Sequence, residues 1–236
     1  MGAIGDNLQA VRARIAAAAL AAGRDPSSVG LLAVSKTFGA CAVVEARAAG
    51  QQAFGESYVQ EAVDKIAVVA DPGIEWHFIG PLQSNKTRQV AEHFDWVHSV
   101  ASLKIARRLS EQRPAARGAL SVCLQVNVSG EATKAGVSEA ELPALAAAVA
   151  ALPGLRLRGL MCIPAPADGV DAQRQPFAHL ARMRERLRAG GFALDTLSMG
   201  MSDDLEAAIA EGATWVRVGT AIFGARTAAG AGTIGA

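Results

Sequence analysis

A lysine follows a short apolar run near the start of the chain. Leu31 to Val34 are aliphatic, Ser35 is small, and Lys36 comes next. A run of this length between turn residues predicts a buried β-strand, so Lys36 should stand where the strand leaves the core. A lysine amine withdrawn from water is a usable nucleophile, and it typically forms a Schiff base with an aldehyde. The alternative interpretation is a lysine that caps the strand and reaches solvent.

Two segments near the other end of the chain combine glycine with hydroxyl side chains. Ser198, Gly200 and Ser202 precede one predicted helix, and Gly219 and Thr220 precede another element. Small residues let backbone N–H groups approach an anion, hydroxyls add donors, and the start of a helix favours negative charge. The pattern indicates a phosphate site, although each glycine taken alone is equally compatible with a tight turn.

The elements that carry these residues alternate between strand and helix. The predicted strands cover residues 29–35, 52–55, 75–79, 96–99, 120–128, 155–161, 196–199 and 215–218, and a further helix, 6–22, precedes them. This alternation predicts an α/β fold, a single (β/α)8 TIM-type barrel with an extra N-terminal helix. We expect the barrel to span residues 1–226 and the Gly/Ala-rich tail, 227–236, to be flexible. An open doubly wound sheet is the alternative, but no Gly-x-Gly-x-x-Gly follows the first strand.

A barrel would bring the lysine and the glycine-rich segments together. Functional residues of such barrels stand at the C-terminal ends of the strands, and phosphate is commonly bound after the seventh and eighth. Lys36, after the first strand, would then face the predicted phosphate site. A cofactor that carries both an aldehyde and a phosphate fits both ends of this arrangement, and pyridoxal 5'-phosphate is the obvious candidate.

Three further strand-end side chains are candidate cofactor-binding residues. Arg217 is either a solvated arginine or a donor to the pyridine nitrogen, which would then stay unprotonated because a guanidinium keeps its protons. His77 is more simply a satisfied core histidine, since no second metal ligand accompanies it. Met161 is expected to pack under the cofactor ring.

Composition narrows the class of protein. A net charge of +1 over 236 residues gives no argument for nucleic acid or an anionic membrane as partner. Cys41, Cys123 and Cys162 lie far apart without metal-ligand spacing, which predicts free thiols in a reducing compartment. The N-terminus lacks the pattern of a signal peptide or membrane span. We therefore expect a cytoplasmic protein. We also expect a monomer, although none of these features bears on the oligomeric state.

Several longer motifs extend this interpretation. They are Ala33 to Lys36, Phe54 to Glu56, His77 to Lys86, Gln125 to Asn127, Gly159 to Met161, Leu197 to Asp204 and Arg217 to Gly224. With these motifs the sequence resembles the YggS/PROSC family of pyridoxal phosphate homeostasis proteins, from about Asp6 to Arg226. One position departs from the family, which usually reads Gly-Glu-Asn-Tyr where this chain has serine, Ser57.

The resemblance implies a fold-type III barrel, similar to the N-terminal domain of bacterial alanine racemase, with pyridoxal phosphate on Lys36. Ser198, Gly200, Ser202, Gly219 and Thr220 would surround the phosphate, and Arg217 would meet the ring nitrogen.

The racemase likeness raises the question of catalysis. Racemisation needs a second acid or base opposite the lysine. In the racemases this group is a tyrosine from a C-terminal domain of the partner subunit, which we expect this chain to lack. Its single tyrosine, Tyr58, is predicted to start a helix. The resemblance therefore implies a non-catalytic protein that holds pyridoxal phosphate, controls its free concentration and supplies apo-enzymes. A low-activity amino-acid racemase is the alternative.

Overall fold

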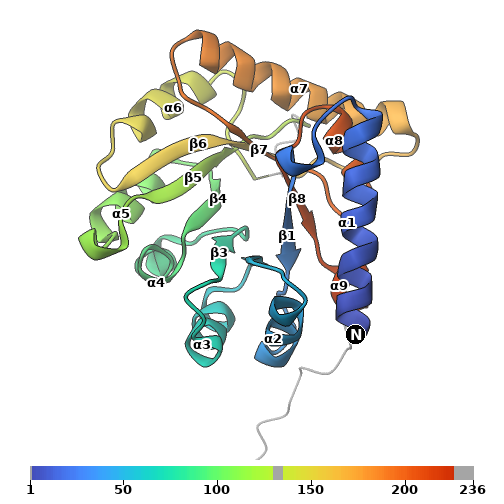
Figure 1. Cartoon of the computed structure of the whole chain (residues 1–236). Coiled ribbons are helices and arrows are strands. Elements are labelled where there is room, and N and C mark those ends of the chain that lie inside the picture. The colour runs from blue at the N-terminus through green and yellow to red at the C-terminus, as the bar shows by residue number, and fades with distance from the viewer. Residues whose placement is uncertain (1, 130–134, 226–236) are drawn as a thin grey trace, which may run out of the picture.

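The computed structural model describes residues 2–129 and 135–225. Its parallel strands close into an eight-stranded barrel in which each strand pairs with its neighbours in sequence and the last pairs with the first (Figure 1). The strands are β1 (Gly30–Val34), β2 (Ala53–Glu56), β3 (Glu75–Phe78), β4 (Trp96–Val100), β5 (Leu120–Gln125), β6 (Leu155–Met161), β7 (Thr196–Ser198) and β8 (Trp215–Val218). The predicted TIM-type barrel is thus confirmed.

Helices surround the barrel (Figure 1). They are α1 (Ala3–Ala21), α2 (Ala40–Ala48), α3 (Val59–Val69), α4 (Thr87–His93), α5 (Leu103–Gln112), α6 (Leu142–Ala150), α7 (Val170–Ala189), α8 (Leu205–Ala210) and α9 (Thr220–Phe223). The extra N-terminal helix, α1, packs against α8 and α9. None of the helices within the described residues is long and apolar enough to cross a bilayer.

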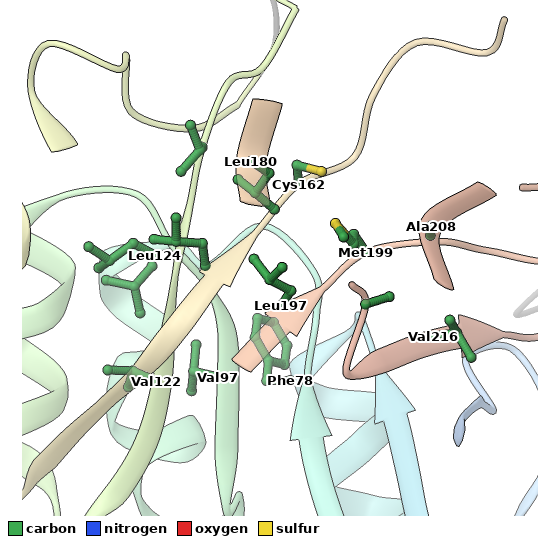
Figure 2. Packing of buried hydrophobic residues seen from close by; sticks show 14 of the residues in the cluster. Phe78, Val97, Val122, Leu124, Cys162, Leu180, Leu197, Met199, Ala208 and Val216 are labelled. Atoms are coloured by element: carbon green, nitrogen blue, oxygen red, sulfur yellow. The ribbon is translucent and has the colours of Figure 1, made fainter. Parts of the chain in front are cut away.

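Buried side chains form two layers, because successive strand residues point to opposite faces of a sheet. The outer layer, which includes Val97, Val122, Leu197 and Val216, packs between the strands and the helices (Figure 2). The inner layer fills the barrel, and it is unusually polar. It includes a small apolar cluster of Trp96, Cys123 and Met161 together with buried histidine and arginine side chains.

Several element ends differ from the prediction. β1 ends at Val34, so Lys36 lies in a turn two residues beyond the strand. The fifth strand stops at Gln125, although Val126 adds one isolated bridge beyond it. α6 begins at Leu142, directly after a turn over residues 139–141. The segment 227–236, predicted to be a flexible tail, lies outside the described residues.

Candidate functional site

The C-terminal ends of the strands surround a cleft of about 470 Å³. Its lining residues are Arg14, Val34, Lys36, Ser57, Ile79, Ile163, Met201, Ser202, Asp203, Arg217, Gly219, Thr220 and Ala221. Five of the predicted site residues are among them: Lys36, Ser202, Arg217, Gly219 and Thr220. Barrel closure therefore brings the lysine that follows β1 into one cleft with the residues that follow β7 and β8.

The other four predicted residues do not line this cleft. Gly200 is buried, and Ser198, His77 and Met161 are fully buried. Both ring nitrogens of His77 have hydrogen-bond partners, as expected for a satisfied core histidine. Direct contact between these four residues and a cofactor stays a prediction.

A buried ion pair holds the turn that carries Lys36. Lys65 Nζ on α3 donates to Glu56 Oε1 at 2.6 Å and to the carbonyl oxygen of Ser35 at 2.9 Å. The Ser35 hydroxyl donates to the same Glu56 oxygen at 2.7 Å. Both charged side chains are almost fully buried, with 3% of Lys65 and none of Glu56 exposed. The residue immediately before Lys36 is thus fixed through both its backbone and its side chain.

The residue after Lys36 is held by the same helix. Glu61 Oε1 accepts the backbone N–H of Thr37 at 2.7 Å and also accepts from Lys65 at 3.1 Å. Thr37 has a φ of +69°, a left-handed conformation that is uncommon for a β-branched residue. Such strained residues persist where the surroundings over-determine them. We infer that the cluster of Glu56, Glu61 and Lys65 sets the direction in which Lys36 leaves the turn.

The contacts of Glu56 only partly offset the cost of burying its carboxylate. Burial raises the pKa of its carboxyl above the ordinary value, although the charge and hydrogen bond of Lys65 act to lower it. Among the described residues, no hydrogen-bond partner contacts its second oxygen, Oε2. A buried carboxylate with one free oxygen is costly, and its electrostatic balance therefore depends on Lys65.

Glycines shape the opposite side of the cleft. Gly200 has a φ of +92°, and a Cβ there would lie 2.5 Å from Cβ of Ala208, so only glycine fits this turn out of β7. A Cβ on Gly219 would lie 3.2 Å from the Val34 carbonyl oxygen, which means that the loop after β8 passes close to β1.

Arg14 was not predicted to belong to the site. It reaches the cleft from α1, donates to the carbonyl oxygen of Ser202 at 3.0 Å and pairs with Glu206 at 2.8 Å. The extra N-terminal helix therefore supports the loop that carries Ser202. The sequence signals nothing of this contact, because Arg14 and Ser202 are distant along the chain.

Arg217 lies in the cleft wall with only 4% of its surface exposed. Its Nη1 donates to Ser198 Oγ and its Nη2 donates to the carbonyl oxygen of Cys162, both at 2.9 Å. Desolvation by burial lowers its pKa from the ordinary value of 12.5. A guanidinium still remains charged in such a setting, so Arg217 presents a fixed positive donor to the cleft.

Within the described residues, no group of histidine, cysteine, aspartate and glutamate could hold a metal ion. The cleft instead combines a primary amine, hydroxyl groups, close backbone approaches and a fixed guanidinium. This donor set suits a carbonyl compound that also carries an anionic group.

Comparison with known proteins agrees with the geometry. The family model described as alanine racemase, N-terminal domain, matches residues 6–227. A pyridoxal phosphate homeostasis protein of Pseudomonas aeruginosa is 65% identical over 226 residues, which cover 96% of this chain and 97% of that protein. The protein of the same name from Escherichia coli K12 is 56% identical over 229 residues, which cover 96% of this chain and 98% of that protein.

Two solved structures have a similar fold. PipY of Synechococcus elongatus, solved with PLP bound, superposes with a TM-score of 0.83 at 41% identity and covers 94% of this chain and 100% of its own. Alanine racemase from Corynebacterium glutamicum gives a TM-score of 0.71 at 18% identity, over 94% of this chain and 61% of the racemase. The second likeness shows the fold alone.

The barrel, its lysine-containing cleft and the matching family model define a protein of the alanine racemase N-terminal domain class. Within this class, the chain belongs to the family of pyridoxal phosphate homeostasis proteins, which confirms the resemblance seen in the sequence.

Proposed function

We propose that this protein binds pyridoxal 5'-phosphate in the cleft as a Schiff base on Lys36 and takes part in intracellular homeostasis of the cofactor. The observation that carries the proposal is that Lys36 shares one cleft with Ser202, Arg217, Gly219 and Thr220. The names of the relatives and the PLP-bound PipY structure support it.

Each cleft residue has a role that its chemistry suits. Lys36 supplies the amine, and the loops with Ser202, Gly219 and Thr220 would hold the phosphate through hydroxyl and backbone donors. Ser198 and Gly200 belong to the same phosphate prediction; Gly200 fits it by shaping the loop. Arg217 would donate to the ring nitrogen and keep it unprotonated, which makes the ring a weak electron sink. When bound, the cofactor supplies a reactive aldehyde, so holding it limits unwanted reactions with other amines.

The cleft favours storage and delivery over turnover. Tyr58 precedes α3, is 54% exposed and is not part of the cleft wall. Besides Lys36 and the permanently protonated Arg14 and Arg217, Asp203 is the one ionisable group among the described lining residues, and it belongs to the loop on the proposed phosphate side. A second base placed opposite the lysine, which two-base racemisation requires, is not found among these residues. The alternative of a low-activity racemase draws on the shared fold.

Delivery has further implications. We propose that apo-enzymes that require pyridoxal phosphate receive the cofactor in the cytoplasm, and that the protein acts as a monomer without nucleic acid or membrane as partner. Cys41, Cys123 and Cys162 are free thiols in the structure, which fits a reducing compartment.

The test compares the purified protein with Lys36→Ala and with Lys104→Ala, an exposed lysine on α5. After loading with pyridoxal phosphate and desalting, the native protein and Lys104→Ala should be yellow and should activate an apo-enzyme. Lys36→Ala should be colourless. Turnover of L- and D-alanine by the native protein, at rates typical of an enzyme, would instead support the racemase alternative.

A further inference from the structure

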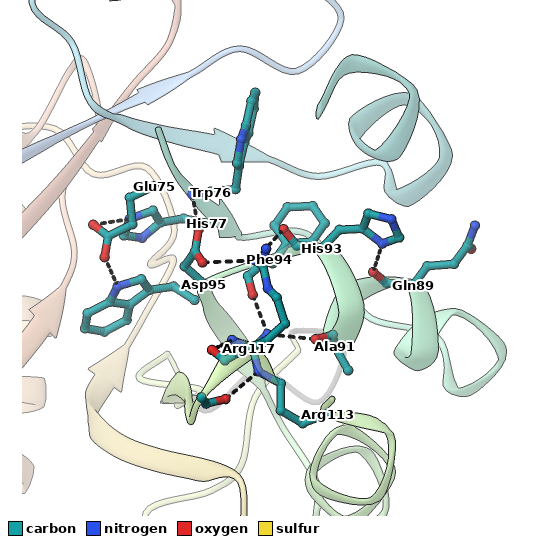
Figure 3. A network of polar contacts seen from close by, with 12 residues as sticks. Glu75, Trp76, His77, Gln89, Ala91, His93, Phe94, Asp95, Arg113 and Arg117 are labelled. Atoms are coloured by element: carbon teal, nitrogen blue, oxygen red, sulfur yellow. Dashed lines mark hydrogen bonds and ion pairs between the residues drawn. The ribbon is translucent and has the colours of Figure 1, made fainter. Parts of the chain in front are cut away.

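A continuous chain of hydrogen bonds crosses the barrel interior below the cleft. Arg217 Nη1 lies 2.9 Å from Ser198 Oγ, and this oxygen lies 2.7 Å from His98 Nδ1. His98 Nε2 lies 2.9 Å from His77 Nδ1, and His77 Nε2 lies 3.1 Å from Glu75 Oε2. Arg217 lies on β8, Ser198 on β7, His98 on β4, and His77 and Glu75 on β3. Figure 3 shows the contact between His77 and Glu75. The three middle side chains are fully buried, whereas 44% of the Glu75 side chain is exposed.

This chain of hydrogen bonds connects the two ends of the barrel. Arg217 lines the cleft at the C-terminal face, while Glu75 is the first residue of β3 and lines a separate cavity that includes Gln51 and Trp215. Glu75 Oε1 also accepts the indole N–H of Trp96 at 2.8 Å. The carboxylate therefore has both oxygens occupied at the far end of the chain.

Elementary donor rules fix the direction of every bond. A guanidinium only donates, so Ser198 Oγ accepts from Arg217; it gives its own proton to His98 Nδ1 because the acceptor-only Glu75 carboxylate at the other end holds both neutral rings protonated at Nε2. A neutral His98 then carries its proton on Nε2 and donates it to His77 Nδ1. A neutral His77 likewise carries its proton on Nε2, where it meets the Glu75 carboxylate, which only accepts.

Burial and packing keep both rings in this form. Desolvation lowers the pKa of His77, although the hydrogen bond and charge of Glu75 act to raise it, and desolvation lowers the pKa of His98 well below its ordinary value, where the positive charge of Arg217 acts in the same direction. The His77 ring stacks on Trp96, with centroids 5.4 Å apart and planes at 7°, and it meets Trp215 edge-on. The lowered pKa values favour the neutral form of both rings, and the two tryptophans leave the His77 ring little room to rotate.

We propose that Ser198, His98, His77 and Glu75 are positioning residues for Arg217, and that Glu75 sets the direction of the chain from the opposite face of the barrel. The charge of Asp204 acts to raise the pKa of Arg217, and the hydrogen-bond chain in addition links Arg217 to the carboxylate of Glu75. The consequence for the cofactor rests on the proposed function, whereas the direction of the chain does not.

Glu75→Gln gives a sharp test because it changes one oxygen into a donor. The amide oxygen must accept from Trp96, since facing its NH2 group toward the indole N–H would oppose two donors. The amide NH2 then donates to His77 Nε2. His77 and His98 must both move their proton to Nδ1, and Ser198 Oγ accepts from both neighbours. A merely structural role for Glu75 would not move the proton of His98.

The experiment follows the imidazole nitrogens of the cofactor-free protein by nuclear magnetic resonance with nitrogen-15 histidine. The native protein should show His77 and His98 protonated at Nε2. His93 is an internal reference of opposite type, because its Nδ1 donates to the Gln89 carbonyl oxygen at 2.8 Å. The matched control is Glu139→Gln, since Glu139 bonds His179 Nε2 at 2.8 Å outside the chain and its side chain is also 44% exposed.

Glu75→Gln should shift both buried histidines to the Nδ1 form, and Glu139→Gln should leave them unchanged. An Nδ1 proton on His98 in the native protein, or no change in Glu75→Gln, overturns the proposal. On loaded protein, Glu75→Gln should raise the dissociation constant of pyridoxal phosphate by roughly twofold or more over Glu139→Gln, because neighbouring bonds polarise one another. Equal constants overturn the coupling to Arg217. A native protein that takes up no cofactor refutes the proposed function and leaves the histidine result standing.

Discussion

Lys65→Met tests whether the buried charge cluster supports the turn of Lys36. The substitution keeps an unbranched side chain of similar length and removes the ammonium group, so the carboxylate of Glu56 loses the ion pair at 2.6 Å and keeps the Ser35 hydroxyl. Both partners are almost fully buried. Breaking one side of such a pair costs about 3–5 kcal/mol of unfolding free energy.

The loss should depend on pH. Burial already raises the pKa of Glu56, and Lys65 is the main influence that lowers it, so the variant should have a still higher pKa. Between the ordinary carboxyl pKa and this raised value, the folded state binds more protons than the unfolded state, and stability falls as pH rises. The difference from the native protein should therefore be close to its full size at pH 8 and smaller at pH 5, where mainly the loss of the Lys65 hydrogen bonds to the Ser35 carbonyl oxygen and to Glu61 remains.

Urea unfolding at both pH values measures this difference. Lys104→Met on α5, which is exposed, should stay within about 0.5 kcal/mol of the native protein. The double variant Lys65→Met/Glu56→Gln removes both charges and should recover much of the loss, without the pH dependence. A deficit below about 1 kcal/mol at pH 8, or one of equal size at pH 5, would refute the assigned role of the pair.

Other predictions concern the phosphate side of the cleft and the thiols. Thr220→Val should weaken retention of pyridoxal phosphate by about 1–2 kcal/mol, the size of one hydrogen bond to a charged acceptor, and an unchanged dissociation constant would count against the phosphate assignment. Gly200→Ala forces a methyl group into a left-handed turn and should lower the unfolding free energy by about 1–3 kcal/mol, which a chemical denaturation curve would reveal or exclude. Cys41 is exposed, whereas burial raises the pKa of Cys123 and raises that of Cys162 to about 12. Ellman's reagent should thus label one of the three thiols quickly in the native protein, and rapid labelling of a second would contradict the structure.

Periodicity was sufficient to predict the barrel because every strand pairs with its sequence neighbours. The meeting of Lys36 with the glycine-rich loops could be predicted, because all of them follow the C-terminal ends of strands. The exact ends of the strands did not follow from the sequence, and they place the two predicted serines differently. Ser198 is the last residue of β7 and points into the barrel toward Arg217, whereas Ser202 lies beyond the strand and lines the cleft.

Hydrogen bonds between polar residues far apart in the sequence could not be predicted either. His98 reads as an ordinary strand residue, and its partner Ser198 stands 100 positions away. Only barrel closure brings them together. The pair Glu61 and Lys65 left a faint signal in its i, i+4 spacing on α3, but nothing local shows that Glu56 completes the cluster.

The proposed function depends above all on which amine of the protein holds the cofactor. Borohydride reduction of the loaded protein, followed by proteolysis and mass spectrometry of the modified peptide, identifies that amine directly. We expect one stable pyridoxyl group on Lys36 and none on this peptide before reduction. A modified residue elsewhere in the chain, with Lys36 unmodified, would contradict the central claim.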